Sequence, residues 1–164
     1  MPGRTVMAFF AAVAFTTACE STTENKISYK ATLTGAQEVP PVTTSGSGTF
    51  NATFDEGSQI LSYTLTFTGL TSNATLAHIH GPAASGVNAD VLVNFSDVTG
   101  GRTITLGGTS GSGSGTINLT STSVITATVS GDSLRKLLDS GNAYVNVHTA
   151  TNGGGELRGQ ITRQ

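Results

Sequence analysis

The sequence predicts an all-β protein: a Greek-key β-sandwich or partly closed barrel with one short helix. Two observations carry this prediction. From residue 27 onward, short runs of alternating apolar and polar residues are separated by Gly and polar turns. Charged residues make up only 11% of the chain, while Thr, Ser and Gly are abundant, as expected where Thr and Ser occupy the outward positions of strands.

The clearest strand is expected at residues 60–68. Apolar residues at 61, 63, 65 and 67 alternate there with Ser and Thr, which is typical of an antiparallel strand with one buried face. Similar patterns predict nine further strands, at 27–33, 48–54, 75–80, 90–95, 102–106, 113–119, 124–130, 143–148 and 157–161.

One helix is expected at residues 133–139. Leu134, Leu137 and Leu138 fall at helical spacing and form one apolar stripe. Asp132 is expected to cap the start of this helix and Gly141 to end it.

Residues 1–18 are expected to be an export signal rather than part of the fold. Arg4 supplies the positive charge, residues 6–15 are apolar, and small residues precede Cys19, the only cysteine. The apolar stretch is shorter than the roughly 20 residues that span a bilayer. This order resembles the lipobox of bacterial lipoprotein signal peptides, and the resemblance implies that cleavage falls before Cys19, which then carries the lipid. The alternative is an ordinary secretory signal with an incidental cysteine.

The domain organisation follows from that resemblance. Residues 19–26 would be the lipidated cysteine and a polar tether, and residues 27–164 one folded domain. The protein would then be exported and anchored to the cell membrane or the outer membrane, facing the periplasm or the exterior. A single cysteine forms no internal disulfide. The net charge of −2 and the absence of a basic cluster argue against nucleic acid as a partner.

All three histidines lie in two of the predicted strands. His78 and His80 share one strand face because they are two residues apart, and His148 projects away from Val145 and Val147. If the two strands are neighbours, the three imidazoles converge on one patch that suits copper or zinc. The alternative is that the imidazoles hydrogen-bond loop backbone and have a structural role.

Three further residues are candidates for ligands or for hydrogen-bond partners of the ligands. Asp90 and Glu156 each follow a histidine motif after a similar stretch of chain. Asn146 aligns with His78 in a weak internal repeat that also aligns His80 with His148. Glu156 and Arg158 are expected to share a strand face and to form an ion pair at a sheet edge, and Glu38 to have a local structural role.

Five segments in order resemble the CHRD (chordin-type) domain family. They are LTGAQEVPPV at 33–42, GSGTF at 46–50, AHIHGPA at 77–83, YVNVHT at 144–149 and GGELRGQI at 154–161. The resemblance implies an extracytoplasmic all-β module without a settled biochemical activity. The His-x-His strand also resembles the copper-ligand strand of copper/zinc superoxide dismutases, but the chain lacks the further histidines and the disulfide of a full dismutase.

These observations favour a lipid-anchored extracytoplasmic binding module that holds a copper or zinc ion through His78, His80 and His148, and that is not an enzyme. The first alternative is a copper-dependent redox enzyme acting on oxygen species, loosely like a superoxide dismutase. The second is a metal-free adhesion or scaffold domain that binds an extracytoplasmic protein or a glycan.

Overall fold

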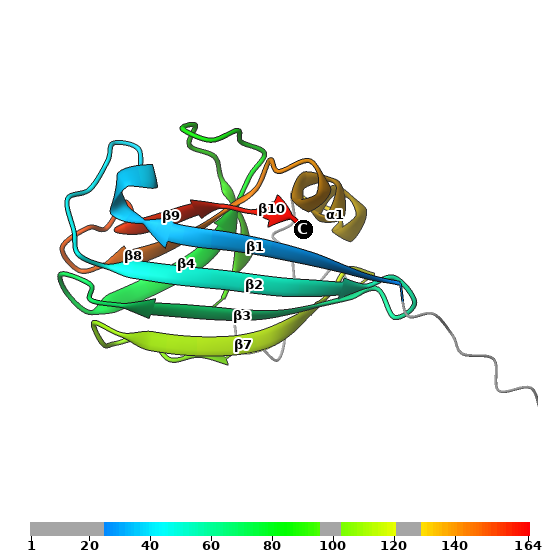
Figure 1. The fold of residues 1–164 in the computed structure, drawn as a ribbon, viewed down its shortest axis with the longest axis horizontal. Coiled ribbons are helices and arrows are strands. Elements are labelled where there is room, and N and C mark those ends of the chain that lie inside the picture. Colours follow the sequence, from blue (N-terminus) through cyan, green and yellow to red (C-terminus); the bar gives the residue numbers. More distant parts are fainter. Residues whose placement is uncertain (1–24, 96–102, 121–128) are drawn as a thin grey trace, which may run out of the picture.

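The computed structural model describes residues 25–95, 103–120 and 129–164. They form one antiparallel sheet that curls into a half-barrel, with one α-helix, α1 (Gly131–Asp139), against one end (Figure 1). A short 3-10 helix (Gly35–Gln37) follows the first strand. The strands are β1 (Lys26–Thr34), β2 (Ser47–Asp55), β3 (Ile60–Thr68), β4 (Ala74–His80), β5 (Val91–Asn94), β6 (Thr103–Ile104), β7 (Gly111–Asn118), β8 (Tyr144–Thr149), β9 (Leu157–Gln160) and β10 (Thr162–Arg163).

The strands are hydrogen-bonded in the order β5-β4-β8-β9-β1-β2-β3-β7-β6, and β10 also pairs with β1. Consecutive strands that are not neighbours in the sheet include β3 and β4, β5 and β6, which stand at its two ends, and β7 and β8, which are joined through α1. Figure 1 shows β1, β2, β3 and β7 side by side, with β4 passing behind them. The all-β prediction with one short helix is confirmed, and the single continuous sheet fits the partly closed barrel.

Alternation of side chains builds the core. In β1, β2 and β3 every second residue is buried, as the period-two patterns predict. At the centre of the core the ring of Tyr63 lies 6.1 Å from that of Phe50 and 4.8 Å from that of Phe95. The inward residues thus fill the concave side of the sheet with large apolar groups.

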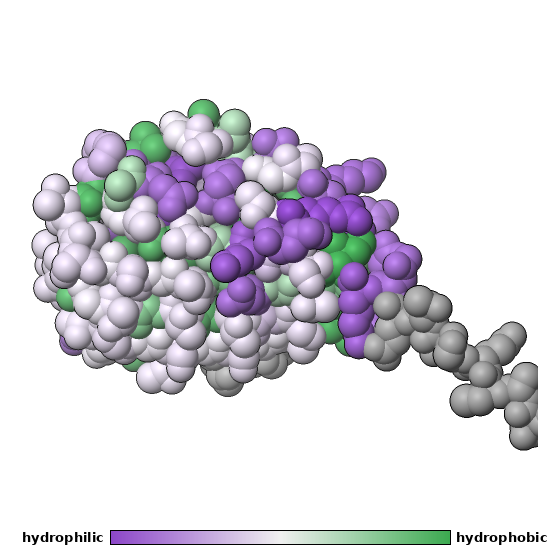
Figure 2. All heavy atoms as spheres, in the orientation of Figure 1, coloured by the Kyte–Doolittle hydropathy of each residue, from purple (hydrophilic) through white to green (hydrophobic). Residues whose placement is uncertain are grey.

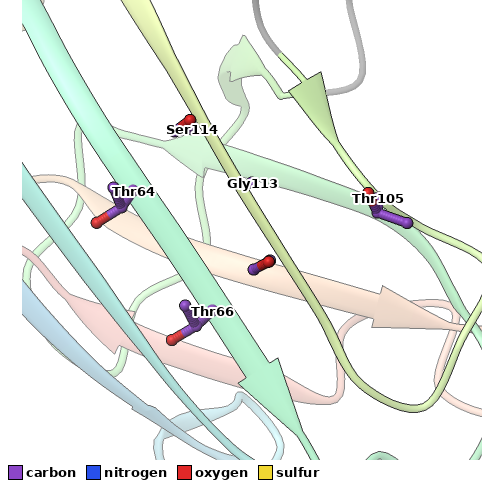
Figure 3. A pocket seen from close by; sticks show the side chains of 6 residues that line it. Thr64, Thr66, Thr105, Gly113 and Ser114 are labelled. Carbon is purple, nitrogen blue, oxygen red and sulfur yellow. The ribbon is translucent and has the colours of Figure 1, made fainter.

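The outward side of these strands carries hydroxyl groups. Thr49 and Thr66 face each other across β2 and β3, and their Oγ1 atoms are 2.9 Å apart. In Figure 2 this face is mostly pale, the colour of Thr, Ser and Gly, and strongly hydrophilic residues gather towards the right-hand end, at which β1 begins in Figure 1. Figure 3 shows a hollow on the same face, lined by Thr64, Thr66, Thr105, Ser112, Gly113 and Ser114.

The start of α1 differs from the sequence prediction. The helix begins at Gly131, and Ser130 is the N-cap, its Oγ accepting a hydrogen bond from the Ser133 backbone N–H. The prediction that Asp132 caps the helix is therefore wrong. Asp132 lies within the first turn, where its negative charge interacts favourably with the helix dipole. A side chain at position 131 is excluded, because a Cβ atom there would lie 1.6 Å from the Leu119 carbonyl oxygen.

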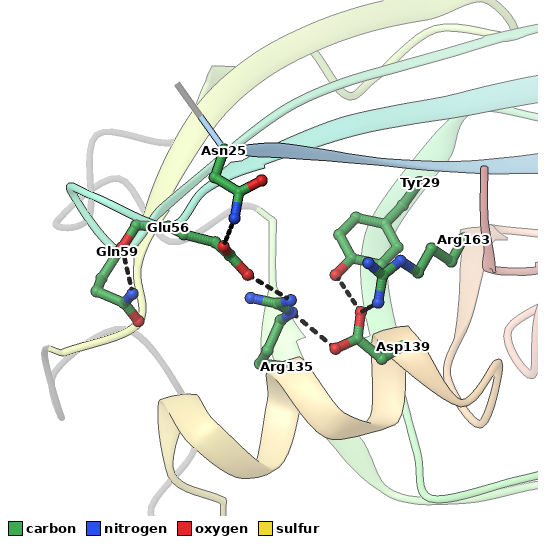
Figure 4. Close-up of polar contacts among 7 residues, drawn as sticks. All are labelled: Asn25, Tyr29, Glu56, Gln59, Arg135, Asp139 and Arg163. Atoms are coloured by element: carbon green, nitrogen blue, oxygen red, sulfur yellow. Dashed lines mark hydrogen bonds and ion pairs between the residues drawn. The ribbon is translucent and has the colours of Figure 1, made fainter. Parts of the chain in front are cut away.

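Polar contacts join α1 to the ends of the strands (Figure 4). The Asp139 carboxylate accepts hydrogen bonds from the Tyr29 hydroxyl at 2.7 Å and from Arg135 Nε at 2.9 Å, and Arg163 Nη1 lies 3.3 Å from it. Arg135 Nη2 also reaches Glu56 at 3.3 Å. The helix is thereby tied to β1, β10 and the turn after β2.

Most of the predicted strands are present, with small shifts at their ends. The predicted strand at 124–130 lies mostly outside the described residues, and Val129 and Ser130 are not in a strand. β10 and the 3-10 helix were not expected from the sequence. In the described part of the chain, no helix has the length and apolar character needed to cross a membrane.

We expect Leu138→Ala to lower the free energy of unfolding by about 2–5 kcal/mol, because Leu138 is fully buried and the substitution leaves a cavity. Chemical denaturation measures this change. The control is Lys136→Ala on the exposed side of α1, which should shift stability by less than about 0.5 kcal/mol. Equal effects of the two substitutions would show that α1 does not pack on the sheet in solution.

Candidate metal centre

The three histidines meet because β4 and β8 are antiparallel neighbours. In their register His78 lies opposite Asn146, His80 opposite Tyr144, and Leu76 opposite His148. One nitrogen of each imidazole lies within 4.8 Å of the others. The predicted convergence of the imidazoles is therefore confirmed.

The cluster lies on the face of β4 and β8 that points away from the apolar core. Ala77, Ile79, Val145 and Val147 point the other way and are fully buried among apolar residues. All six residues of β8 are buried, so this strand is covered on both faces. Only 7% of His78, 8% of His80 and 9% of His148 is exposed. The chain thus has a second, polar interior between these strands and the loops that cover them.

Two backbone carbonyls orient two of the imidazoles. His80 Nδ1 donates to the Ala89 carbonyl and His148 Nδ1 to the Gly153 carbonyl, both at 3.0 Å. Because a carbonyl only accepts, both rings carry their proton on Nδ1, and in the neutral rings Nε2 bears the lone pair. Metal-binding histidines are commonly held in this way by their second nitrogen.

The remaining ring nitrogens turn towards one another. His148 Nε2 lies 2.9 Å from His78 Nδ1. His80 Nε2 is buried and has no hydrogen-bond partner among the described residues. A buried acceptor without a partner is uncommon in folded proteins and calls for an explanation. Because His148 carries its proton on Nδ1, its Nε2 accepts the hydrogen bond that His78 Nδ1 donates. Binding of an ion by His78 Nδ1 would therefore require the His78 proton to move to Nε2.

Burial keeps the three rings neutral. Desolvation, together with smaller effects of the neighbouring imidazoles of His148 and His80, lowers the pKa of His78 to about 4. Desolvation also lowers the pKa values of His80 and His148, and it outweighs the hydrogen bonds to Ala89 and Gly153. At neutral pH the three rings are therefore uncharged, and Nε2 of His80 and Nε2 of His148 carry no proton, as a metal ligand requires.

Neither candidate carboxylate belongs to this group of nitrogen atoms. Asp90 is exposed, and its backbone carbonyl accepts a hydrogen bond from Gly81 N–H. Glu156 is fully buried, but its two oxygens accept five hydrogen bonds from elsewhere. The donors are the Thr44 hydroxyl, the Thr71 backbone N–H and hydroxyl, the Thr149 hydroxyl and the Asn152 amide.

Asn146 connects the histidine strand to a distant loop. Its Nδ2 donates to Glu38 Oε1 at 2.7 Å, and its Oδ1 is buried without a partner among the described residues. Burial raises the pKa of Glu38 to about 7, although the positive charge of Arg158 opposes the shift. Gly155 packs against this pair at a φ of +133°, and a Cβ atom there would lie 2.2 Å from Asn146 Nδ2. Glu38 thus has a structural role, but its partner Asn146 is distant in the chain, whereas a local role was predicted.

The predicted ion pair between Glu156 and Arg158 is wrong. β9 begins at Leu157, so Glu156 stands in the loop before the strand and the two side chains do not share a strand face. Arg158 instead donates from Nη1 to Asn88 Oδ1 at 2.9 Å and from Nη2 to the Val87 carbonyl at 2.6 Å.

Sequence reasoning missed two residues beside the cluster. The ring of Tyr144 stacks on the His80 imidazole, with centroids 4.9 Å apart and planes 3° from parallel. The Arg158 guanidinium lies 3.5 Å from the centroid of the same tyrosine ring. The period of two along β8 places Tyr144 on the face of His148, so this residue could have been found, whereas Arg158 required the register of β9 on β8.

Three neutral imidazoles that each place one nitrogen within 4.8 Å of the others suit a borderline transition metal such as Zn²⁺ or copper. The cluster contains no carboxylate among the described residues. Any charge on a bound ion would therefore be balanced by groups outside the ligand set.

Comparison with known families supports the assignment made from the sequence motifs. The model of the CHRD domain matches residues 29–161, a range that contains all three histidines. No curated protein and no solved structure matches the chain.

Glu156→Gln should change how stability depends on pH. The hydrogen bonds overcome the effect of burial and lower the pKa of Glu156 from 4.5 to about 2. A lowered carboxyl pKa contributes stability that is present above pH 4.5 and is lost as the pH falls towards 2. Urea denaturation should therefore show a loss of about 1–3 kcal/mol at pH 6 for the variant, and a smaller one near pH 2. Stability curves that run parallel at all pH values would contradict this role.

Proposed function

The chain belongs to the CHRD domain family, and from this premise we propose that it is an exported, lipid-anchored module that holds a copper or zinc ion. The ligands are His78, His80 and His148. The metal site and the anchor are separate parts of this proposal and are tested separately.

The observation that carries the metal proposal is the buried Nε2 of His80, which has no hydrogen-bond partner within the described ranges and lies beside His78 and His148. Leaving a buried acceptor unsatisfied costs roughly 1–3 kcal/mol. A bound ion would satisfy this atom together with His78 Nδ1 and His148 Nε2. The backbone carbonyls of Ala89 and Gly153 already hold two of the rings in the tautomer that this requires.

The ligand chemistry limits the choice of ion. Neutral imidazoles suit copper and zinc, and three protein nitrogens leave a further coordination position for water or another donor. Bound copper would supply one-electron redox chemistry and bound zinc would not. Because each imidazole is more than nine-tenths buried, we favour a protein that holds the metal over a redox enzyme that turns over a substrate.

The anchor proposal concerns residues outside the described part of the chain. Cys19 would carry the lipid, and residues 19–26 would link it to the domain, whose first strand begins at Lys26. In Figure 1 this strand starts at the opposite end of the sheet from the 3-10 helix. The lipid would therefore leave the loops at that other end free to face away from the membrane.

Calorimetric titration of Cu(II) and Zn(II) into the purified protein tests the metal site. We expect sub-micromolar binding close to one ion per chain, weakened at least about tenfold in His80→Ala and in His148→Ala, since each removes one of three ligands. The control is Thr64→Ala, on the hydroxyl-lined face away from the histidines. Weak binding, or binding unchanged by the histidine substitutions, would overturn the metal proposal and leave a metal-free adhesion or scaffold domain.

Cys19→Ser tests the anchor. We expect the unmodified protein in the membrane fraction, with acyl chains on Cys19 by mass spectrometry, and the variant in the soluble fraction, since acyl chains supply the membrane affinity. His80→Ala is the matched control and should stay with the membrane. Retention of the Cys19→Ser variant in the membrane would contradict the lipoprotein assignment.

A further inference from the structure

Three stacked side chains form a column across three neighbouring strands. Arg158 on β9 lies over the ring of Tyr144 on β8, and that ring stacks on His80 of β4. Because β8 lies between β4 and β9 in the sheet, the tyrosine ring is sandwiched between the guanidinium and the imidazole. All three side chains are more than nine-tenths buried.

All three side chains of the column also form hydrogen bonds with the loop between β4 and β5. Arg158 donates to the Val87 carbonyl and to the Asn88 side chain. The Tyr144 hydroxyl accepts a hydrogen bond from the Ala89 backbone N–H at 3.2 Å. His80 Nδ1 donates to the Ala89 carbonyl. The three members of the column therefore bind three successive residues of the loop between β4 and β5.

Arg158 contributes no ion pair to this arrangement among the described residues; both of its acceptors are neutral oxygens. The charge of Arg158 acts on the Glu38 carboxyl and lowers its pKa, but no direct ion pair joins the two side chains in the described part of the chain. Burying a cation without a direct ion pair is costly. The face of an aromatic ring offsets part of that cost, and a planar guanidinium stacks on it better than an ammonium group does. A cation used for stability alone would gain more from a carboxylate than from the ring it covers here.

The position of His80 depends on its stacking against Tyr144 and on its hydrogen bond to the Ala89 carbonyl. The stacking fixes the plane of the imidazole, and the Ala89 carbonyl fixes its proton on Nδ1. Arg158 and Tyr144 hold the loop that supplies this carbonyl. With Nδ1 occupied, Nε2 is the nitrogen left to meet His78 and His148.

We propose that Arg158 and Tyr144 are positioning residues that hold His80 with Nε2 ready to bind the metal. This inference rests on the proposed function for its purpose, but the geometry that it describes exists without a metal. Loss of a residue that orients a metal ligand typically costs 10–100-fold in affinity. The effect on His80 should therefore be visible both in the empty protein and in metal binding.

The first experiment is nitrogen-15 NMR of the histidine rings in the metal-free full chain. In the unsubstituted protein, His80 and His148 should both be Nδ1–H tautomers. In Tyr144→Leu and Arg158→Met, His80 should become a mixture of tautomers. His148 should not change, because its partner Gly153 lies in another loop. An unchanged His80, or an equal change in His148, would overturn the proposal.

Gln160→Ala is the matched control. Gln160 lies on β9 with Arg158 and donates to the Ala83 carbonyl at the other end of the same loop. This variant should leave the His80 tautomer unchanged. If it altered His80 as much as Arg158→Met does, general loosening of the loop would explain the result and the proposal would fall.

Metal titration of the same variants separates stacking from charge. Affinity for Cu(II) or Zn(II) should fall about 10–100-fold in Arg158→Met and Tyr144→Leu. Arg158→Lys, which keeps the charge but not the planar group, should not restore it. Full restoration by lysine would overturn the stacking argument. If the unsubstituted protein bound no metal, the proposed function would fail, and the tautomer of His80 would still decide the positioning role.

Discussion

The register of β4 against β8 is the constraint on which the rest of the site depends. Side chains alternate between the two faces of a strand, so a slip of one residue would exchange the faces. His78 and His80 would then enter the apolar core, and Ile79 would take their place. Ala77, Ile79, Val145 and Val147 are fully buried on the core face of these strands, so their packing opposes such a slip. The same hydrophobic core that stabilises the barrel therefore also aligns the three imidazoles.

The outer face of β4, β8 and β9 carries a layer of polar side chains that are buried under loops. Buried polar groups must find hydrogen bonds, and here the covering loops supply them. Glu156 shows how: its buried carboxylate joins the loop after β1 through Thr44, the loop after β3 through Thr71, and the loop after β8 through Asn152. The last of these loops contains Gly153, whose carbonyl orients His148. Glu156 thus supports the candidate site without being a ligand in it.

The chemistry of the site follows from burial and from the lack of acidic ligands. Desolvation lowers the pKa of each imidazole, so the rings are uncharged, and a cation does not have to displace a proton from Nε2 of His80 or of His148. The neutral ligand set and the nearby guanidinium give the site a different character from a carboxylate-rich site for hard cations. These features support the proposal that this member of the CHRD family holds a transition metal.

Local pattern in the sequence was enough to predict the elements and the shared face of the histidines. The alternation in β3, the leucine stripe of α1 and the two-residue spacing of His78 and His80 depend on neighbours in the chain, and all are present in the structure. Tertiary structure alone decided which nitrogen of His80 and of His148 carries the proton, because Ala89 and Gly153 reach these two rings through the paths of their loops. It also separated Glu156 from Arg158 and brought Arg158 over Tyr144. Such contacts depend on strand order and register across the sheet, which no short stretch of sequence contains.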